Sequence, residues 1–205
     1  MPSSIVKAIV FDLGEVLIKL DFSQVMALRK KCSQHLEASI QSMNEWPIYD
    51  AFERGHVNEF EFIQKINLEL SLSLNPETFK TIWNSVLKEP VPEIGTTLKR
   101  LNKKYPLWAL TNSNETHIKH FKNNYPWHQE FQEVLTSFEL GHRKPEKEIY
   151  EKMLNRIGFK SDEILFLDDR KENVEGARKL GIRSELCQHT PEDLPHIFKR
   201  HSINF

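Results

Sequence analysis

Four short polar segments carry the residues with the clearest chemical potential. Asp12 follows one apolar run, Thr111 follows a second, and the pair Asp168-Asp169 follows a third. Lys144 lies in a Gly-His-Arg-Lys-Pro segment between the last two. A carboxylate able to act as a nucleophile, a hydroxyl, a cation and two further carboxylates would form a reactive site if the fold brought them into one crevice.

The apolar runs before these segments indicate the elements that position them. The runs Ile5–Phe11, Leu107–Leu110 and Ile164–Leu167 are nearly uninterrupted, which is typical of strands buried on both faces of a parallel sheet. Ligands of open α/β sheets bind outside the carboxyl ends of the strands, and Gly14 lets the backbone turn close to a ligand there. The sequence therefore predicts an α/β fold with the four polar segments at one sheet edge.

Carboxylates at that edge indicate a metal. Asp12, Asp168 and Asp169 would repel one another if they met, and a divalent cation would relieve the repulsion. Oxygen ligands without a histidine or cysteine partner favour Mg²⁺ over zinc. We therefore expect Mg²⁺ as the cofactor.

The pattern between the first two polar segments is helical. A capping box at Asn58 and a proline at the first position after Asn75 each begin a helix with a periodic apolar face. We predict about four short helices here. The expected boundaries are residues 22–91 for a helical cap, and residues 1–21 and 92–205 for the α/β core.

Composition excludes several classes of partner. The 205 residues include 28 basic and 29 acidic side chains, a net charge of -1, so the basic field of a nucleic-acid or membrane-surface binder is missing. Cys32 and Cys187 have no metal-binding or disulfide spacing and suit a reducing compartment. Lys7 within the first apolar run argues against a signal peptide. We expect a cytoplasmic protein that acts on a small molecule; its oligomeric state is not predicted.

The polar segments resemble the motifs of the haloacid dehalogenase-like hydrolase superfamily. The matching positions, in the family's order, are Asp12–Val16, Thr111, Lys144 and Asp168-Asp169. The helical insert resembles the type C1 cap of subfamily IA. Leu110–Asn112 and Arg143–Pro145 resemble the branch containing bacterial sugar-phosphate phosphatases, including α-D-glucose-1-phosphate phosphatases. The resemblance implies a Rossmann-like three-layer core, a small cap and a Mg²⁺-dependent phosphatase.

The resemblance also implies catalytic and substrate-binding roles. Asp12 would attack phosphorus and form an aspartyl-phosphate, which water then hydrolyses. Thr111 would hydrogen-bond a phosphoryl oxygen, with the Asn112 backbone N–H beside it. Lys144 would neutralise negative charge on the phosphate and the nucleophile.

The metal ligands that the resemblance implies are Asp12, Asp169 and the backbone carbonyl of Gly14. Asp168 would act through water or by positioning. Asn173 would either hold this loop or cap the following helix.

Gly14 is also where the sequence departs from the family. Most phosphatases of the superfamily have a second aspartate there, which serves as general acid and base. Such catalysis typically contributes about 10²–10⁴-fold, and strand alternation would turn Glu15 away from the face of Asp12. We therefore expect a substrate whose leaving group needs little protonation, such as an anomeric sugar 1-phosphate or an acyl phosphate.

Two other functions remain open from the sequence. In a 2-haloacid dehalogenase Asp12 would attack carbon, although the pair Asp168-Asp169 argues against it. A protein that only binds a phosphorylated ligand or a protein partner would not need the nucleophile.

Several polar side chains lie outside the motifs. We expect His117 and His120 on an exposed helix face rather than in a metal site. His142 and Arg143 would either shape the phosphate rim or lie in an exposed loop. The helical insert has a turn at Gly55 that could face the site, although packing within the bundle is favoured for the aromatic residues beside it. The residues around this turn are Tyr49, Phe52, Glu53, Arg54 and His56.

Overall fold

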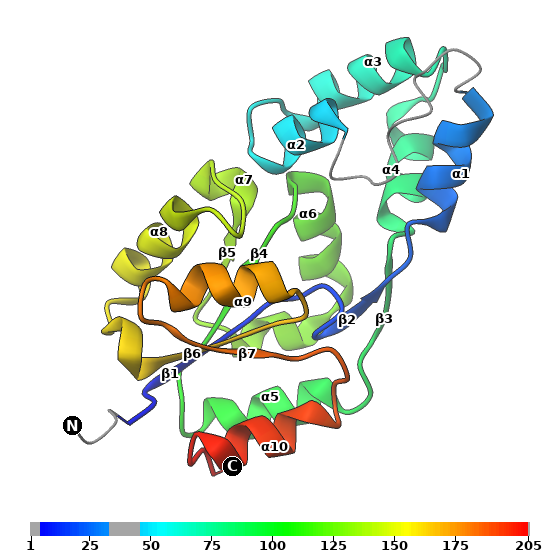
Figure 1. The fold of residues 1–205 in the computed structure, drawn as a ribbon. Coiled ribbons are helices and arrows are strands. Elements are labelled where there is room, and N and C mark those ends of the chain that lie inside the picture. The colour runs from blue at the N-terminus through cyan, green and yellow to red at the C-terminus, as the bar shows by residue number, and fades with distance from the viewer. Residues whose placement is uncertain (1–4, 33–45, 205) are drawn as a thin grey trace.

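A five-stranded parallel sheet forms the centre of the molecule (Figure 1). The computed structural model describes residues 5–32 and 46–204. The sheet order is β5-β4-β1-β6-β7, and every neighbouring pair is parallel. Its strands are β1 (Ala8–Phe11), β4 (Leu107–Thr111), β5 (Glu133–Thr136), β6 (Ile164–Asp168) and β7 (Arg183–Leu186).

Helices cover both faces of this sheet, because its central strands are apolar on both sides. Ile9 and Phe11 pack with α5 (Ile94–Asn102), α6 (Glu115–Asn124) and α10 (Asp193–Arg200). Ala8 and Val10 pack on the other face with α8 (Lys147–Ile157) and α9 (Lys171–Arg178). The predicted three-layer α/β core is therefore confirmed. The short connecting helices are η2 (Pro126–Glu130), α7 (Ser137–Leu140) and η3 (Ser161–Glu163).

In the residues that the structure describes, four helices form a separate unit beside the sheet, which we call the helical unit (Figure 1). They are α1 (Ser23–Cys32), α2 (Pro47–Glu53), α3 (Glu59–Glu69) and α4 (Pro76–Asn84). The capping box at Asn58 and the proline after Asn75 start α3 and α4 as predicted. Phe62, Phe79 and Trp83 belong to a hydrophobic core of the unit's own.

Two short antiparallel strands join the helical unit to the sheet. They are β2 (Ile18–Leu20) and β3 (Leu87–Pro90). The Asp21 N–H donates to the Val86 carbonyl, and the Val91 N–H donates to the Leu17 carbonyl. These two bonds extend the pairing of β2 with β3 beyond both ends of the strands. The domain boundaries at residues 22 and 91 stay a prediction.

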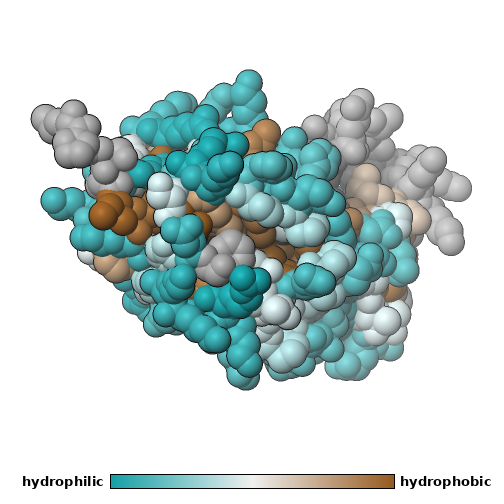
Figure 2. Space-filling model, turned by 90° about the horizontal axis from the view of Figure 1, so that it is seen from below, coloured by the Kyte–Doolittle hydropathy of each residue, from teal (hydrophilic) through white to brown (hydrophobic). Residues whose placement is uncertain are grey.

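The face in Figure 2 is mainly hydrophilic. In the part of the chain that the structure describes, no helix is both long and apolar enough to cross a membrane.

Candidate active site

The four polar segments converge at the carboxyl edge of the sheet. Lys144 reaches this edge from a loop, and its Nζ lies 2.9 Å from Asp12 Oδ1 and 2.7 Å from Asp168 Oδ2. Only 1% of the Lys144 side chain is exposed, so Lys144 is not a surface lysine. Thr111 ends β4 and is buried, while Asn114 rather than Thr111 caps α6. We call Asp12, Thr111, Lys144, Asp168 and Asp169 the sheet-edge site.

Asn112 fixes the position of the lysine. Its side-chain Oδ1 accepts from the Lys144 backbone N–H at 2.8 Å, and its Nδ2 donates to the Lys144 carbonyl at 3.0 Å. The Lys144 ammonium also donates to the Leu110 carbonyl at 2.8 Å. These bonds hold the cation against the end of β4, a side-chain role of Asn112 that sequence reasoning missed.

Asp168 orients the neighbouring groups from a fully buried position. Its Oδ1 accepts from the Arg170 backbone N–H and from Asn173 Nδ2, both at 2.9 Å. The N-cap of α9 is Arg170, so Asn173 holds the loop rather than capping the helix. Its Oδ2 accepts from Lys144 Nζ at 2.7 Å. Asp168 therefore positions both the Lys144 ammonium and the loop that follows β6.

The donor set at this edge fits a hard divalent cation. Asp12, Asp168 and Asp169 each offer a carboxylate oxygen, and these oxygens lie within 4.8 Å of one another. Burial raises the pKa of Asp12 to about 7 even though Lys144 opposes the shift. Burial and Asp168 together raise the pKa of Asp169 to about 6. Crowded carboxylates with raised pKa values are stabilised by a bound cation, and oxygen-only donors favour Mg²⁺.

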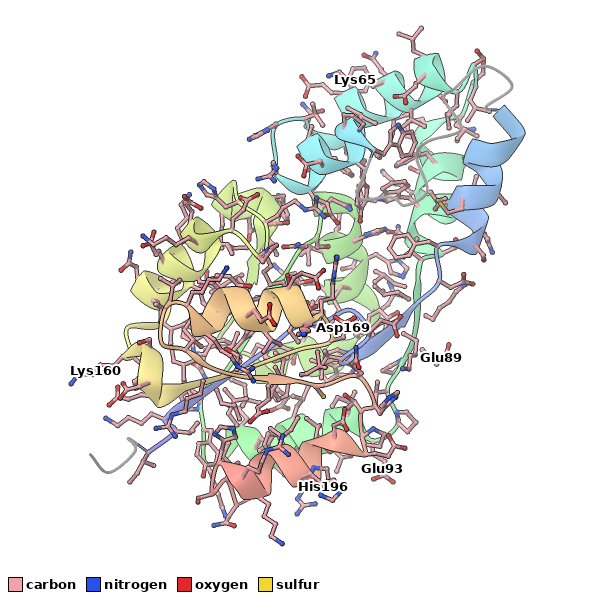
Figure 3. The ribbon with its side chains drawn as sticks, in the orientation of Figure 1. Lys65, Glu89, Glu93, Lys160, Asp169 and His196 are labelled. Carbon is pink, nitrogen blue, oxygen red and sulfur yellow. The ribbon has the colours of Figure 1, made fainter. Side chains whose placement is uncertain are left out.

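A cavity of about 290 Å³ separates the sheet-edge site from the helical unit. Figure 3 shows Asp169 beside the N-terminal end of α9. Asp12, Thr111, Lys144 and Asp169 line the cavity on the side of the sheet. The opposite lining comes from α2 and from β2, β3 and their flanks: Tyr49, Glu53, Leu20, Phe22, Val86 and Leu87.

Gly14 and Glu15 border the cavity, but neither supplies a general acid to the sheet-edge site. A Cβ atom at position 14 would lie 2.7 Å from Leu20 Cδ1, so Leu20 fills the space of a larger residue. Glu15 Oε1 accepts from the Leu20 backbone N–H at 2.8 Å. The reason predicted for its orientation is wrong: β1 ends at Phe11, and Glu15 lies in a loop with a φ of 58°.

The prediction that His117 is exposed is also wrong. His117 is buried, its Nε2 lies 3.0 Å from the Trp83 carbonyl, and its ring stacks on the Trp83 ring at a centroid distance of 5.6 Å. Burial lowers its pKa to about 4. Trp83 belongs to α4, so this contact joins the sheet layer to the helical unit. The local sequence around His117 gives no sign of it.

Side chains from α2 and the turn after it contact residues 141–146, which we call the lysine loop. Tyr49 Oη donates to Glu53 Oε1 at 2.5 Å. Arg143 is buried, with its guanidinium 2.7 Å from both Glu53 Oε2 and Asp50 Oδ1. Arg54 binds Glu146 through two nitrogens, at 2.5 and 2.9 Å. Bundle packing alone therefore does not describe Tyr49, and Arg143 is not in an exposed loop.

A family model for haloacid dehalogenase-like hydrolases matches residues 6–181. The chain belongs to this family. It is similar to a D-ribitol-5-phosphate phosphatase of Bacteroides thetaiotaomicron, with 24% identity over 186 residues that cover 87% of this chain and 90% of the relative. It is also similar to a sesquiterpene phosphatase of Aspergillus oryzae, with 26% identity over 86% of this chain and 87% of the relative.

A solved structure shares the whole architecture. A family enzyme of Bacteroides thetaiotaomicron, in complex with magnesium and inorganic phosphate, aligns with a TM-score of 0.81 and 27% identity. The alignment covers 92% of this chain and 98% of that enzyme. Together with the carboxylate cluster, these similarities identify the chain as a phosphatase of this family with Mg²⁺ as its cofactor.

Proposed function

We propose that this enzyme hydrolyses the phosphate monoester of a small sugar or polyol through an aspartyl-phosphate on Asp12. The observation that carries the proposal is the buried contact of Lys144 with both Asp12 and Asp168 beside the cavity. A surface lysine would be hydrated, whereas this ammonium is held where charge develops during phosphoryl transfer.

The reaction has two steps that these residues support. An Asp12 carboxylate oxygen attacks phosphorus, the P–O bond to the leaving group breaks, and the leaving oxygen departs with the bonding electrons and takes its proton from solvent water. Water then attacks the aspartyl-phosphate, which releases inorganic phosphate and restores Asp12. Thr111, the Asn112 N–H and Lys144 bind the phosphoryl oxygens through both steps.

Asp12, Asp169 and the Gly14 carbonyl would hold the Mg²⁺, with Asp168 behind them. When bound, the metal neutralises negative charge on the phosphate and the carboxylates. Asp168 positions Lys144 and the loop through the bonds described above.

Two features bear on the leaving group. Gly14 supplies no general acid, which favours an anomeric 1-phosphate or an acyl phosphate over an alkyl ester. The relatives are named for a polyol 5-phosphate and for a sesquiterpene, and a polyol 5-phosphate is an alkyl ester. The substrate panel must therefore vary the leaving group and its hydroxyl groups separately.

The cytoplasmic location stays part of this proposal. The spacing of Cys32 and Cys187, which suits a reducing compartment, supports this location.

The test is phosphate release from glucose 1-phosphate, D-ribitol 5-phosphate, acetyl phosphate and a simple alkyl phosphate, with Mg²⁺ or with EDTA. Metal-dependent turnover that Asp12→Asn abolishes is the expected result. Faster turnover of glucose 1-phosphate than of D-ribitol 5-phosphate would support the leaving-group argument. Release of halide from a 2-haloacid, without release of phosphate from any ester, would contradict the proposed function.

A further inference from the structure

The helical unit presents two polar side chains to the cavity that the phosphoryl chemistry does not use. Tyr49 and Glu53 are four residues apart on α2, one helical turn, so they lie on the same face of that helix. Both are buried, and both line the cavity that contains Asp12. A polar pair therefore faces the sheet-edge site from the opposite side.

This pair is held in a fixed arrangement. Tyr49 Oη donates to one oxygen of the Glu53 carboxylate, and Arg143 lies 2.7 Å from the other. Arg143 also binds Asp50, so its guanidinium bridges two carboxylates of α2. Burying a carboxylate costs free energy that a packing role would not require, since an apolar side chain could fill the same space.

The other carboxylates that line the cavity are engaged elsewhere. In the described part of the chain they are Asp12, Glu15 and Asp169. Asp12 and Asp169 belong to the sheet-edge site, and Glu15 binds the backbone N–H of Leu20. Glu53 differs from them in facing the part of a ligand beyond its phosphate: each of its oxygens has one partner, Tyr49 or Arg143, and keeps a second lone pair that can accept from a ligand hydroxyl.

We propose that Tyr49 and Glu53 bind hydroxyl groups of the leaving group and thereby select sugar or polyol phosphates over phosphates with an apolar substituent. This inference rests on the proposed function. A carboxylate accepts hydrogen bonds from neighbouring hydroxyl groups, and a phenol both donates and accepts. Leu20, Phe22 and Val86 line the same cavity and pack against the C–H groups of the carbon chain.

Four substrates separate recognition of hydroxyl groups from protonation of the leaving group. Glucose 1-phosphate has hydroxyl groups and the better leaving group, and D-ribitol 5-phosphate has hydroxyl groups and the poorer one. Acetyl phosphate and n-propyl phosphate form the matching pair without hydroxyl groups. The values of kcat and KM are measured for each substrate with Mg²⁺.

The variants are Glu53→Gln and Tyr49→Phe, with Glu69→Gln as the control. Glu69 lies on α3 of the same helical unit and accepts from Trp46 Nε1 at 2.5 Å, but it does not line the cavity. We expect Glu53→Gln to lower kcat/KM about 10–100-fold for both hydroxylated substrates, mainly through KM. The loss for acetyl phosphate and n-propyl phosphate should be at least about tenfold smaller. Glu69→Gln should leave the ratios between substrates unchanged.

Other patterns overturn the inference. A loss confined to D-ribitol 5-phosphate and n-propyl phosphate would make Glu53 a proton donor, and an equal loss on all four substrates would make it structural. If Glu53→Gln does not fold, Tyr49→Phe gives the same comparison because it removes a single hydroxyl group. Turnover that depends on Asp12 but shows no selective loss would refute this inference and leave the proposed function standing. Absence of turnover in the unmodified enzyme would refute both.

Discussion

The two sides of the cavity are built in different ways. On the sheet side, Asp12, Thr111 and Asp168 lie at the ends of three neighbouring parallel strands, so backbone hydrogen bonds set their spacing. On the opposite side, Tyr49 and Glu53 lie on the seven-residue helix α2 and are held by side-chain contacts to a loop. The sheet side is therefore suited to holding the reacting groups at a constant spacing. Substitutions on the helical side can alter which leaving group binds without disturbing the sheet.

Two adjacent residues make the contrast direct. Lys144 points into the sheet-edge site and contacts Asp12 and Asp168. Arg143 points to the helical unit and contacts Asp50 and Glu53. One loop thus supplies a cation to each side of the cavity, and substitutions at these two positions test each side separately.

The largest effect is expected for Asp12, which we propose as the nucleophile. Asp12→Asn removes the attacking oxygen while keeping the size of the side chain, and phosphate release should fall by at least about 10³-fold for every ester. Initial rates with Mg²⁺ measure the loss. Glu69→Gln is the control, because Glu69 lies outside the cavity. Residual turnover above a hundredth of the wild-type rate would argue against covalent catalysis by Asp12.

Lys144→Met and Arg143→Met form the second test. We expect Lys144→Met to lower kcat about 10²–10³-fold on all esters, since charge on the phosphoryl group loses its counter-ion. It should also destabilise the fold by about 3–5 kcal/mol, because Asp12 and Asp168 lose their buried partner. Arg143→Met should instead raise KM most for hydroxylated substrates. Denaturant unfolding measures the loss of stability, and steady-state kinetics measure kcat and KM. The same changes in kcat and KM for the two variants would contradict the division of the cavity into two sides.

The sheet side could be predicted from the sequence, for a physical reason. The residues Asp12, Thr111 and Asp168-Asp169 each follow an apolar run, and parallel strands bring their carboxyl ends to one edge whatever the rest of the chain does. The position of Lys144 depended on the resemblance as well, because a loop rather than a strand delivers it.

The helical side could not be predicted in the same way. Arg143 binds Asp50 across 93 positions, and His117 binds Trp83 across 34. Helical periodicity shows that a helix has an apolar face but does not show what packs against its other faces. His117 therefore appeared exposed from the sequence, although the helical unit covers it.

That buried histidine makes the fold sensitive to acid. Its pKa is lowered to about 4 in the folded chain from an ordinary value of 6.5, so the unfolded chain binds the proton more readily between these values. Stability from neutral His117 is complete above pH 6.5 and is lost as the pH falls toward 4. At pH 5 the loss is about 2 kcal/mol.

Urea unfolding at pH 7 and pH 5 measures this loss, with His117→Gln as the comparison. The wild type should lose about 2 kcal/mol more than the variant over this range. Equal losses would show that His117 is not kept neutral between α6 and α4.

Magnesium binding should depend on pH through the sheet-edge site. The pKa of Asp12 is raised to about 7, so most of this carboxyl group is protonated at pH 6 and ionised at pH 8. At pH 6 the metal must therefore displace the proton from Asp12 in order to bind. The apparent affinity should be about tenfold weaker at pH 6. Calorimetric titration in two buffers of different ionisation enthalpy measures both the affinity and the proton release. An affinity independent of pH would mean that Asp12 is ionised before the metal binds.

The smallest effect is expected for the contact between Arg54 of α2 and Glu146. This bidentate pair joins the helical unit to the lysine loop, and 21% of the arginine side chain is exposed. Arg54→Ala should cost about 0.5–1 kcal/mol of stability, and salt should reduce this cost. Arg156→Ala is the matched control, because Arg156 makes a bidentate pair with Glu133 away from the helical unit.

Because Arg54 holds α2 in place, its loss should also raise KM a few-fold for hydroxylated substrates, and the Arg156→Ala control should not. Steady-state kinetics at low and high salt measure the difference. A change in kcat for acetyl phosphate as large as the change in KM would contradict this interpretation, since it would mean that the helical unit also sets the geometry of the sheet-edge site. An effect on KM alone would mean that the reaction is fixed by the strands and that α2 governs which leaving groups reach it.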